Sequence, residues 1–218
     1  MRILIAGATG LVGQGVLREC LRADDVSHVA TLGRKASGRP DPKLTDIVVA
    51  DFAELEGIED QLKPFDACLY CAGSPPIGTL EADYRYVTLH LTMHVATTVA
   101  RLNPDITFVY VSGAKSDSGS RIMQLRVKGE TERALAALHI RTVMLRTGGV
   151  QPVGGERSPH AALAALYAVG GPFMGLSVRL LPQLMTTTER VGRAMLAVLR
   201  QQDPPAVLEN AEINRLGV

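Results

Sequence analysis

The N-terminal stretch Arg2-Ile-Leu-Ile-Ala-Gly-Ala-Thr-Gly-Leu-Val-Gly13 joins a short apolar run to three glycines at a spacing of three residues. The apolar run predicts a buried strand, and the apolar pattern that follows the glycines predicts a helix. Gly7 would allow a sharp turn, Gly10 would let phosphate oxygens approach the backbone, and Gly13 would let the helix pack close to the strand. Because unpaired N–H groups at a helix N-terminus attract anions, this unit predicts a site for a dinucleotide pyrophosphate. The alternative is a glycine-rich turn that holds no ligand.

The composition limits the classes of protein to which this chain can belong. The chain has 218 residues, 46% of them hydrophobic, and a formal net charge of +1. These values fit a single globular domain and argue against a nucleic-acid partner, which would need a basic surplus. Three cysteines are too few for a disulfide framework and favour a reducing compartment. Since the first strand begins at the N-terminus, we expect no signal peptide and a cytoplasmic location.

Apolar runs alternate with longer helical patterns along the first 148 residues. This alternation predicts an α/β fold, a doubly wound Rossmann-type parallel sheet, in which nearly all-apolar strands are covered on both faces. The predicted strands are residues 3–6, 29–32, 47–50, 67–71, 108–112 and 142–145. The predicted helical segments between them are residues 11–21, 55–62, 80–102 and 124–138.

After Gly148 the regular alternation ends. We expect one domain over residues 1–218, with residues 148–218 contributing a small C-terminal substrate lobe that includes a helix near 188–201 and an edge strand at 206–208. Residues 161–178 carry no charge, but Gly170-Gly171-Pro172 interrupts them. Two short helices are therefore expected there rather than a membrane span.

The end of the second predicted strand indicates which dinucleotide binds. An NAD site usually places an acidic residue here for the ribose 2′-hydroxyl, but this chain has Arg34 and Lys35. A guanidinium pairs well with the 2′-phosphate of NADP, so NADP(H) is preferred over NAD(H). The alternative is a solvated basic loop.

Further candidate cofactor residues lie at the ends of the third and fourth predicted strands. Asp51 could accept a hydrogen bond from the adenine amino group beside Phe52, or could cap the following helical segment. Small residues at 71–73 would let the backbone pass close to the cofactor ribose. The full set of candidates is Gly7, Thr9, Gly10, Leu11, Val12, Gly13, Arg34, Lys35, Asp51, Phe52, Cys71, Ala72, Gly73 and Lys128.

These motifs together resemble the short-chain dehydrogenase/reductase superfamily in its extended and atypical branch, the NmrA-like and epimerase/dehydratase-like proteins. The resemblance covers about the first 150 residues. It is based on residues 7–13, 33–34, 51–52 and 71–73, on Val111-Ser-Gly-Ala114 and Val127-Lys-Gly-Glu130, and on the Arg-Thr-Gly-Gly turn at 146–149. It implies a Rossmann sheet, a small carbonyl or hydroxyl substrate, and a homodimer formed through the 80–102 helix.

The resemblance also implies a catalytic serine, tyrosine and lysine, of which this chain retains two. Ser112 and Lys128 match, but Gln124 occupies the tyrosine position, and its amide has no titratable proton. Three interpretations stay open. In the first, another group carries the proton: Lys128 itself, Ser112, Lys115, Tyr84, Tyr86 or His90. In the second, the protein reduces its substrate slowly, or reduces a substrate that needs little help from an acid. In the third, it binds NADP(H) as a sensor or partner-binding module without turnover.

Two weaker patterns predict no metal site. Cys68 and Cys71 have CxxC spacing inside a predicted strand, where positions three apart face opposite sides, so we expect buried cysteines. His90 and His94 share a helix face, but no third ligand is evident for zinc.

Overall fold

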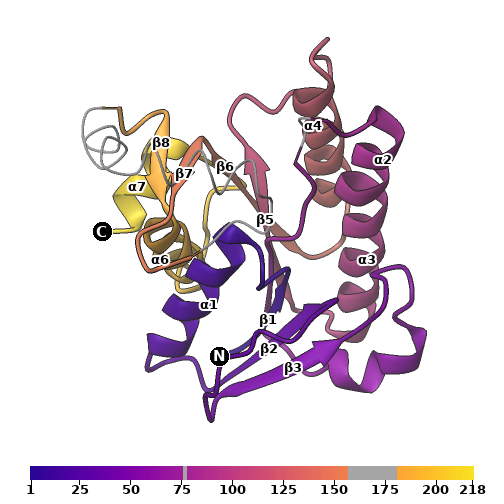
Figure 1. Cartoon of the computed structure of the whole chain (residues 1–218), viewed down its shortest axis with the longest axis vertical. Helices are drawn as coiled ribbons and strands as arrows, with labels where there is room; N and C mark the ends of the chain where they lie inside the picture. Colours follow the sequence, from indigo (N-terminus) through magenta and orange to yellow (C-terminus); the bar gives the residue numbers. More distant parts are fainter. Residues whose placement is uncertain (76–77, 157–180) are drawn as a thin grey trace.

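The computed structural model describes residues 1–75, 78–156 and 181–218 (Figure 1). Within these residues the centre of the molecule is a seven-stranded parallel sheet in the order β3-β2-β1-β4-β5-β6-β9. The predicted doubly wound sheet is therefore confirmed, and the expected edge strand is β9. The strands are β1 Arg2–Ala6, β2 His28–Gly33, β3 Leu44–Val48, β4 Ala67–Tyr70, β5 Thr107–Gly113, β6 Arg141–Thr147 and β9 Val207–Glu209.

Helices cover both faces of the sheet, because alternate strand residues feed two separate cores. Ile3 and Ile5 of β1 join the core under α1 and α6, whereas Leu4 and Ala6 join the core under α3 and α4. The helices of the first face are α1 Leu11–Arg22, α6 Thr188–Leu199 and α7 Asn210–Leu216. Those of the second face are the 3-10 helix η1 Glu56–Leu62, α2 Glu81–Arg85, the π-helical η2 Tyr86–Leu91, α3 Thr92–Leu102 and α4 Met123–Ala136.

The predicted long helix at 80–102 is present, but it is not uniform. Helix α2 runs into the π-helical turn η2, which runs into α3 without a break. A π-helical turn adds one residue to the hydrogen-bonded ring, and such turns are frequent near functional sites.

Two short strands, β7 Gly149–Gln151 and β8 Met185–Thr187, pair in parallel outside the main sheet. Asn210 of helix α7 forms hydrogen bonds beside both strands. The Asn210 side-chain oxygen accepts the Gly148 N–H at 2.8 Å, while its amide nitrogen donates to the Pro182 and Met185 carbonyls at 2.9 Å. The uncharged stretch at 161–178, expected to form two short helices, lies outside the described residues. Among the residues described, no helix is long and apolar enough to cross a membrane.

Helices α1 and α6 approach unusually closely because each presents a glycine at the crossing. A Cβ on Gly15 would lie 2.6 Å from the Thr188 Cβ, and one on Gly192 would lie 2.9 Å from the Glu19 Cγ. This close packing fixes α1, and hence the glycine turn before it, against the C-terminal part of the chain.

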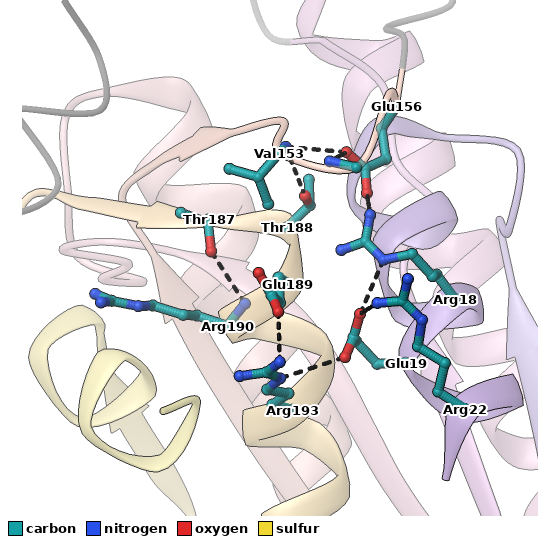
Figure 2. Close-up of polar contacts among 11 residues, drawn as sticks. Arg18, Glu19, Arg22, Val153, Glu156, Thr187, Thr188, Glu189, Arg190 and Arg193 are labelled. Carbon is teal, nitrogen blue, oxygen red and sulfur yellow. Dashed lines mark hydrogen bonds and ion pairs between the residues drawn. The ribbon is translucent and has the colours of Figure 1, made fainter.

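A buried ionic network surrounds this crossing (Figure 2). Arg18 binds both Glu19 of its own helix and Glu156, which follows β7, and all three residues are buried. Arg193 of α6 also reaches Glu19, with its Nε 3.3 Å from the carboxylate. The network therefore connects α1, α6 and the chain after β7.

Candidate functional site

The glycine turn between β1 and α1 has the geometry of an anion site. Gly7 has a φ of +81°, and a Cβ there would lie 2.6 Å from the Ala72 backbone nitrogen and Cα. A Cβ on Gly13 would lie 2.1 Å from the Gly7 carbonyl oxygen. Gly10 caps α1 without a side-chain hydrogen bond, and the first turn of the helix holds no acidic residue. The first amides of α1 are thus left uncapped by side chains, which fits an anionic ligand.

The end of β4 lies directly beside this turn. Cys71 donates its backbone N–H to the Ala6 carbonyl at 2.8 Å, so the chain continues alongside β1 for one more residue. Ala72 then packs under Gly7, and a Cβ on Gly73 would meet no atom within 4 Å. The predicted small-residue segment therefore borders the glycine turn and leaves open space at residue 73.

Arg34 and Lys35 follow the end of β2, and both are exposed without an ion-pair partner in the described part of the chain. An acidic residue that contacts this loop is Asp46 on β3, a residue that sequence reasoning missed. Its carboxylate accepts the Thr31 hydroxyl and both the N–H and the hydroxyl of Ser37, the latter two at 3.1 Å. Asp46 therefore holds the loop that carries the two basic residues.

Asp51 and Phe52 follow β3, as predicted, but each already has a structural partner. The Asp51 carboxylate accepts the Ala53 N–H at 3.0 Å and so caps its own turn, while the N-cap of η1 is Leu55. Phe52 is buried and meets the Tyr70 ring edge-on, with 6.4 Å between the ring centroids. Contact of either residue with an adenine stays a prediction.

Ser112 of β5 is buried, and its hydroxyl faces a polar network. It donates to Glu132 of α4 and lies 3.0 Å from the Ser116 hydroxyl. Glu132 in turn receives three further hydrogen bonds from Arg146, which also pairs with Glu209. The Ser112 hydroxyl is thus committed to Glu132, and its role as a substrate ligand stays a prediction.

The next residue of β5, Gly113, is the one that lies against Lys128. A Cβ on Gly113 would lie 3.2 Å from the Lys128 Cδ. The Lys128 ammonium donates to the Val111 carbonyl at 3.0 Å and lies 5.1 Å from the centre of the Tyr110 ring. Burial lowers the pKa of Lys128 to about 8, although the nearby Glu132 carboxylate opposes this effect.

Gln124 lies in the first turn of α4, four residues before Lys128, so the two residues share a helix face. It is exposed. Gln124 and Lys128 are thus neighbours on α4, and the position that the resemblance assigns to a tyrosine hydroxyl carries an amide; their shared role in a site stays a prediction.

The other candidate proton carriers are more scattered. Tyr84 of α2 is buried, and burial raises the pKa of its hydroxyl. Tyr86 and His90 are exposed on η2, with their ring centroids 6.4 Å apart. Lys115, in the turn after β5, is exposed and has a φ of +61°, which is unusual for a residue other than glycine.

The two cysteines with CxxC spacing differ in burial. Cys68 is buried, and burial raises the pKa of its thiol, while Cys71 is half-buried. No group of three histidine, cysteine, aspartate or glutamate side chains is placed to hold a metal ion in this part of the chain.

Several curated fungal proteins are similar to this chain. The mitochondrial protein fmp52 of Emericella nidulans is 30% identical over 76% of this chain and 74% of its own length. FMP52 of Saccharomyces cerevisiae is 30% identical over 72% and 68%, respectively. FMP52 of Meyerozyma guilliermondii is 24% identical over 99% of this chain and 94% of its own.

These relatives contradict the expectation of a cytoplasmic protein. All three are named mitochondrial proteins, and none of their names indicates a cytoplasmic location. The cysteine argument failed because a small number of cysteines favours a reducing compartment without distinguishing one reducing compartment from another.

Solved structures share the fold at low sequence identity. The UDP-glucuronic acid 4-epimerase of Bacillus cereus, in complex with NAD, matches with a TM-score of 0.68 and 16% identity over 95% of this chain and 76% of its own. MoeE5, in complex with UDP-glucuronic acid and NAD, matches with a TM-score of 0.69 and 20% identity over 95% and 75%.

One family profile matches the N-terminal half of the chain. The profile of the NAD dependent epimerase/dehydratase family matches residues 3–117, which span β1 to the turn after β5. This matched region holds the Gly7–Gly13 turn, the basic loop after β2 and the end of β4. The chain therefore belongs to the NAD-dependent epimerase/dehydratase family of NAD(P)-binding proteins.

Proposed function

We propose that the protein binds NADP(H) in preference to NAD(H) and acts as an oxidoreductase or epimerase-like protein on a small carbonyl or hydroxyl compound. The observation that carries this proposal is the uncapped glycine turn beside an exposed Arg34-Lys35 pair, with the Asp46 carboxylate engaged by Thr31 and Ser37. The NAD in the structures of related fold supports a nicotinamide dinucleotide as the ligand. Residues 148–218 would contribute the substrate lobe.

Calorimetric titration with NADPH and with NADH tests the cofactor preference. A hydrogen bond to a charged group contributes about 1.5–3 kcal/mol, so we expect NADPH to bind roughly 10- to 100-fold more tightly. Arg34→Asp should remove this difference, because a carboxylate repels the 2′-phosphate. Arg39→Asp, at an exposed position of the same loop, is the matched control. Equal affinity for both dinucleotides would contradict the preference.

A second function, binding NADP(H) as a sensor or regulatory protein without turnover, is favoured by the exposed Gln124 and by the commitment of Ser112 to Glu132. Oxidation of NADPH in the presence of a panel of aldehydes and ketones distinguishes the two functions. Sustained turnover by the natural protein, lost in Lys128→Ala, would exclude the sensor.

Gln124→Tyr provides the complementary measurement on the same panel. A positioned general acid contributes about 10²–10⁴-fold in rate, so the variant should gain activity of that order if only the proton donor is weak. A variant that binds NADPH but gains no activity would favour the sensor.

We also propose a homodimer through the 80–102 helix, on which Tyr86 and His90 are exposed. Light scattering combined with size-exclusion chromatography measures the mass directly. A mass of 23.3 kDa at micromolar concentration would contradict the dimer.

A further inference from the structure

Few of the described side chains close to Lys128 could supply a proton. Position 113, which lies against the lysine side chain, is a glycine, and the preceding Ser112 turns its hydroxyl to Glu132. The residue one helical turn away, Gln124, has an amide that does not titrate in water. No carboxylate in the described part of the chain forms an ion pair with either lysine at this edge: Lys115 is exposed in the turn after β5, whereas Lys128 lies against β5 one helical turn from Gln124.

We propose that Lys128 itself supplies the proton to the substrate oxygen, the role that the family gives to the tyrosine missing at position 124. This inference depends on the proposed oxidoreductase function. The Lys128 ammonium has three hydrogens, and its bond to Val111 O uses one of them. Two hydrogens remain for a substrate, and the Lys128 side chain, whose methylenes pack against Gly113, is half-buried rather than fully enclosed.

The proton and electron balance is simple. The substrate carbonyl carbon accepts a hydride from a bound dihydronicotinamide, and the electron pair of the C=O π bond moves to oxygen. That oxygen takes a proton from Nζ of Lys128 and becomes a hydroxyl. The neutral amine then regains a proton from water, so the overall reaction consumes one hydride and one proton.

The charged and titratable groups around Lys128 are consistent with proton donation by its ammonium. Burial lowers its pKa to about 8, where an ammonium is a far better acid than an ordinary lysine. Glu132 on the same helix partly restores the pKa, and Arg146 of β6 binds that carboxylate. Tyr110 of β5 and Tyr84 of α2 are neutral at this pH, because burial raises the pKa of both.

Competitive acetylation of the intact protein, resolved by mass spectrometry of the Lys128 peptide, measures the lysine directly across pH 6–11. We expect half-maximal labelling near pH 8. Glu132→Gln removes the nearby negative charge, so its midpoint should fall by roughly 0.5 pH units. Glu209→Gln, at the exposed end of the same Arg146 network, should leave the midpoint unchanged. A Lys128 midpoint near pH 10 would overturn the proposal.

The rate measurement uses the holoprotein with NADPH and the aldehyde panel. Reduction should fall about tenfold per pH unit above the labelling midpoint, and Glu132→Gln should move the rate profile by the same amount and in the same direction as the labelling. A rate that is flat from pH 7 to 10, or no turnover by protein that binds NADPH, would overturn the proposal. Failure to bind either dinucleotide in calorimetry would instead refute the proposed function on which it depends.

Discussion

Gly7 and Gly13 are both required by the turn, for different steric reasons. Gly7 adopts a left-handed conformation directly against the Ala72 backbone, whereas a Cβ on Gly13 would overlap the Gly7 carbonyl oxygen. We expect Gly7→Ala and Gly13→Ala each to lower the free energy of unfolding by about 1–3 kcal/mol, because backbone must move to make room. Each should also abolish dinucleotide binding. Urea denaturation and calorimetry measure the two effects.

Gly57 provides the matched control for these substitutions. It lies on η1 away from the turn, and a Cβ there would meet no atom within 4 Å. Gly57→Ala should therefore change stability by less than about 0.5 kcal/mol. If Gly7→Ala were as stable as Gly57→Ala and still bound NADPH, the steric interpretation of the turn would be wrong.

Burial of the Lys128 charge should lower the free energy of unfolding. Its pKa falls from the ordinary value for lysine to about 8 on folding, so below pH 8 the folded state holds a desolvated charge. Between pH 8 and about 10.4 the unfolded chain binds more protons, and stability rises with pH. We expect Lys128→Met to be more stable than the natural protein at pH 7, by on the order of 1 kcal/mol after allowing for partial exposure.

Denaturation at several pH values tests whether Lys128→Met is more stable than the natural protein. The advantage of Lys128→Met should shrink as pH rises from 8 to 10, since the natural protein loses its penalty there. Lys35→Met replaces an exposed lysine and should change stability by less than about 0.5 kcal/mol at pH 7. A Lys128→Met variant that is destabilised at pH 7 would mean that the bond to Val111 outweighs the desolvation.

Between elements, the buried Arg18–Glu156 pair connects α1 to the chain after β7 (Figure 2). Burial alone would raise the pKa of Glu156, but backbone hydrogen bonds, including the Gly154 N–H at 2.7 Å, and the Arg18 charge hold it below its ordinary value. Arg18→Met would leave this carboxylate buried without its cation. We expect a loss of about 2–4 kcal/mol in the free energy of unfolding, measured at pH 7.

Arg22 is the matched control, one turn further along α1. It approaches the same Glu19 at 3.4 Å, but 65% of its side chain is exposed. Arg22→Met should cost less than about 0.5 kcal/mol, because exposed pairs contribute little. Since the Glu156 pKa is lowered in the folded state, the contribution of the buried pair should be lost as pH falls below about 4.5. Equal losses in both variants would contradict the role of burial.

The sequence predicted those elements whose pattern is local. Apolar runs identified the strands of the main sheet, and the glycine spacing identified the turn into α1, because each depends on neighbouring residues. The strands β7 and β8 and the helix α7 depend on Asn210, which binds Gly148, Pro182 and Met185, far from it in the chain. No local pattern indicates contacts of that kind.

The site was predicted less completely than the fold, because spacing alone does not show which face of the sheet each residue at a strand end occupies. Spacing places both Ser112 and Gly113 at the end of β5, but only the twist and register of the sheet decide which of them lies against Lys128. Asp46 was missed because its role depends on lying opposite Thr31 on the neighbouring strand. The Arg18–Glu156 pair was missed because 138 positions separate its members.

At the scale of the whole molecule, the C-terminal edge of the sheet gathers cationic and amide donors on a nearly neutral protein. The net charge of +1 gives little long-range attraction for an anion, so binding must come from local groups. The glycine turn supplies fixed amides next to a buried helix, whereas Arg34 and Lys35 lie in an exposed loop. These two parts of the site should therefore respond differently to salt.

We expect the ratio of NADPH to NADH affinity to fall several-fold between 10 mM and 1 M sodium chloride. The screening length shortens from about 30 Å to about 3 Å over this range, which weakens exposed charge pairs most. Both dinucleotides carry the pyrophosphate, so its salt dependence cancels in the ratio and leaves that of the 2′-phosphate. Arg34→Asp should show a small ratio that no longer falls with salt. A natural protein whose ratio stayed constant from 10 mM to 1 M would place the discrimination in a buried contact, and the basic loop after β2 would then have no part in cofactor choice.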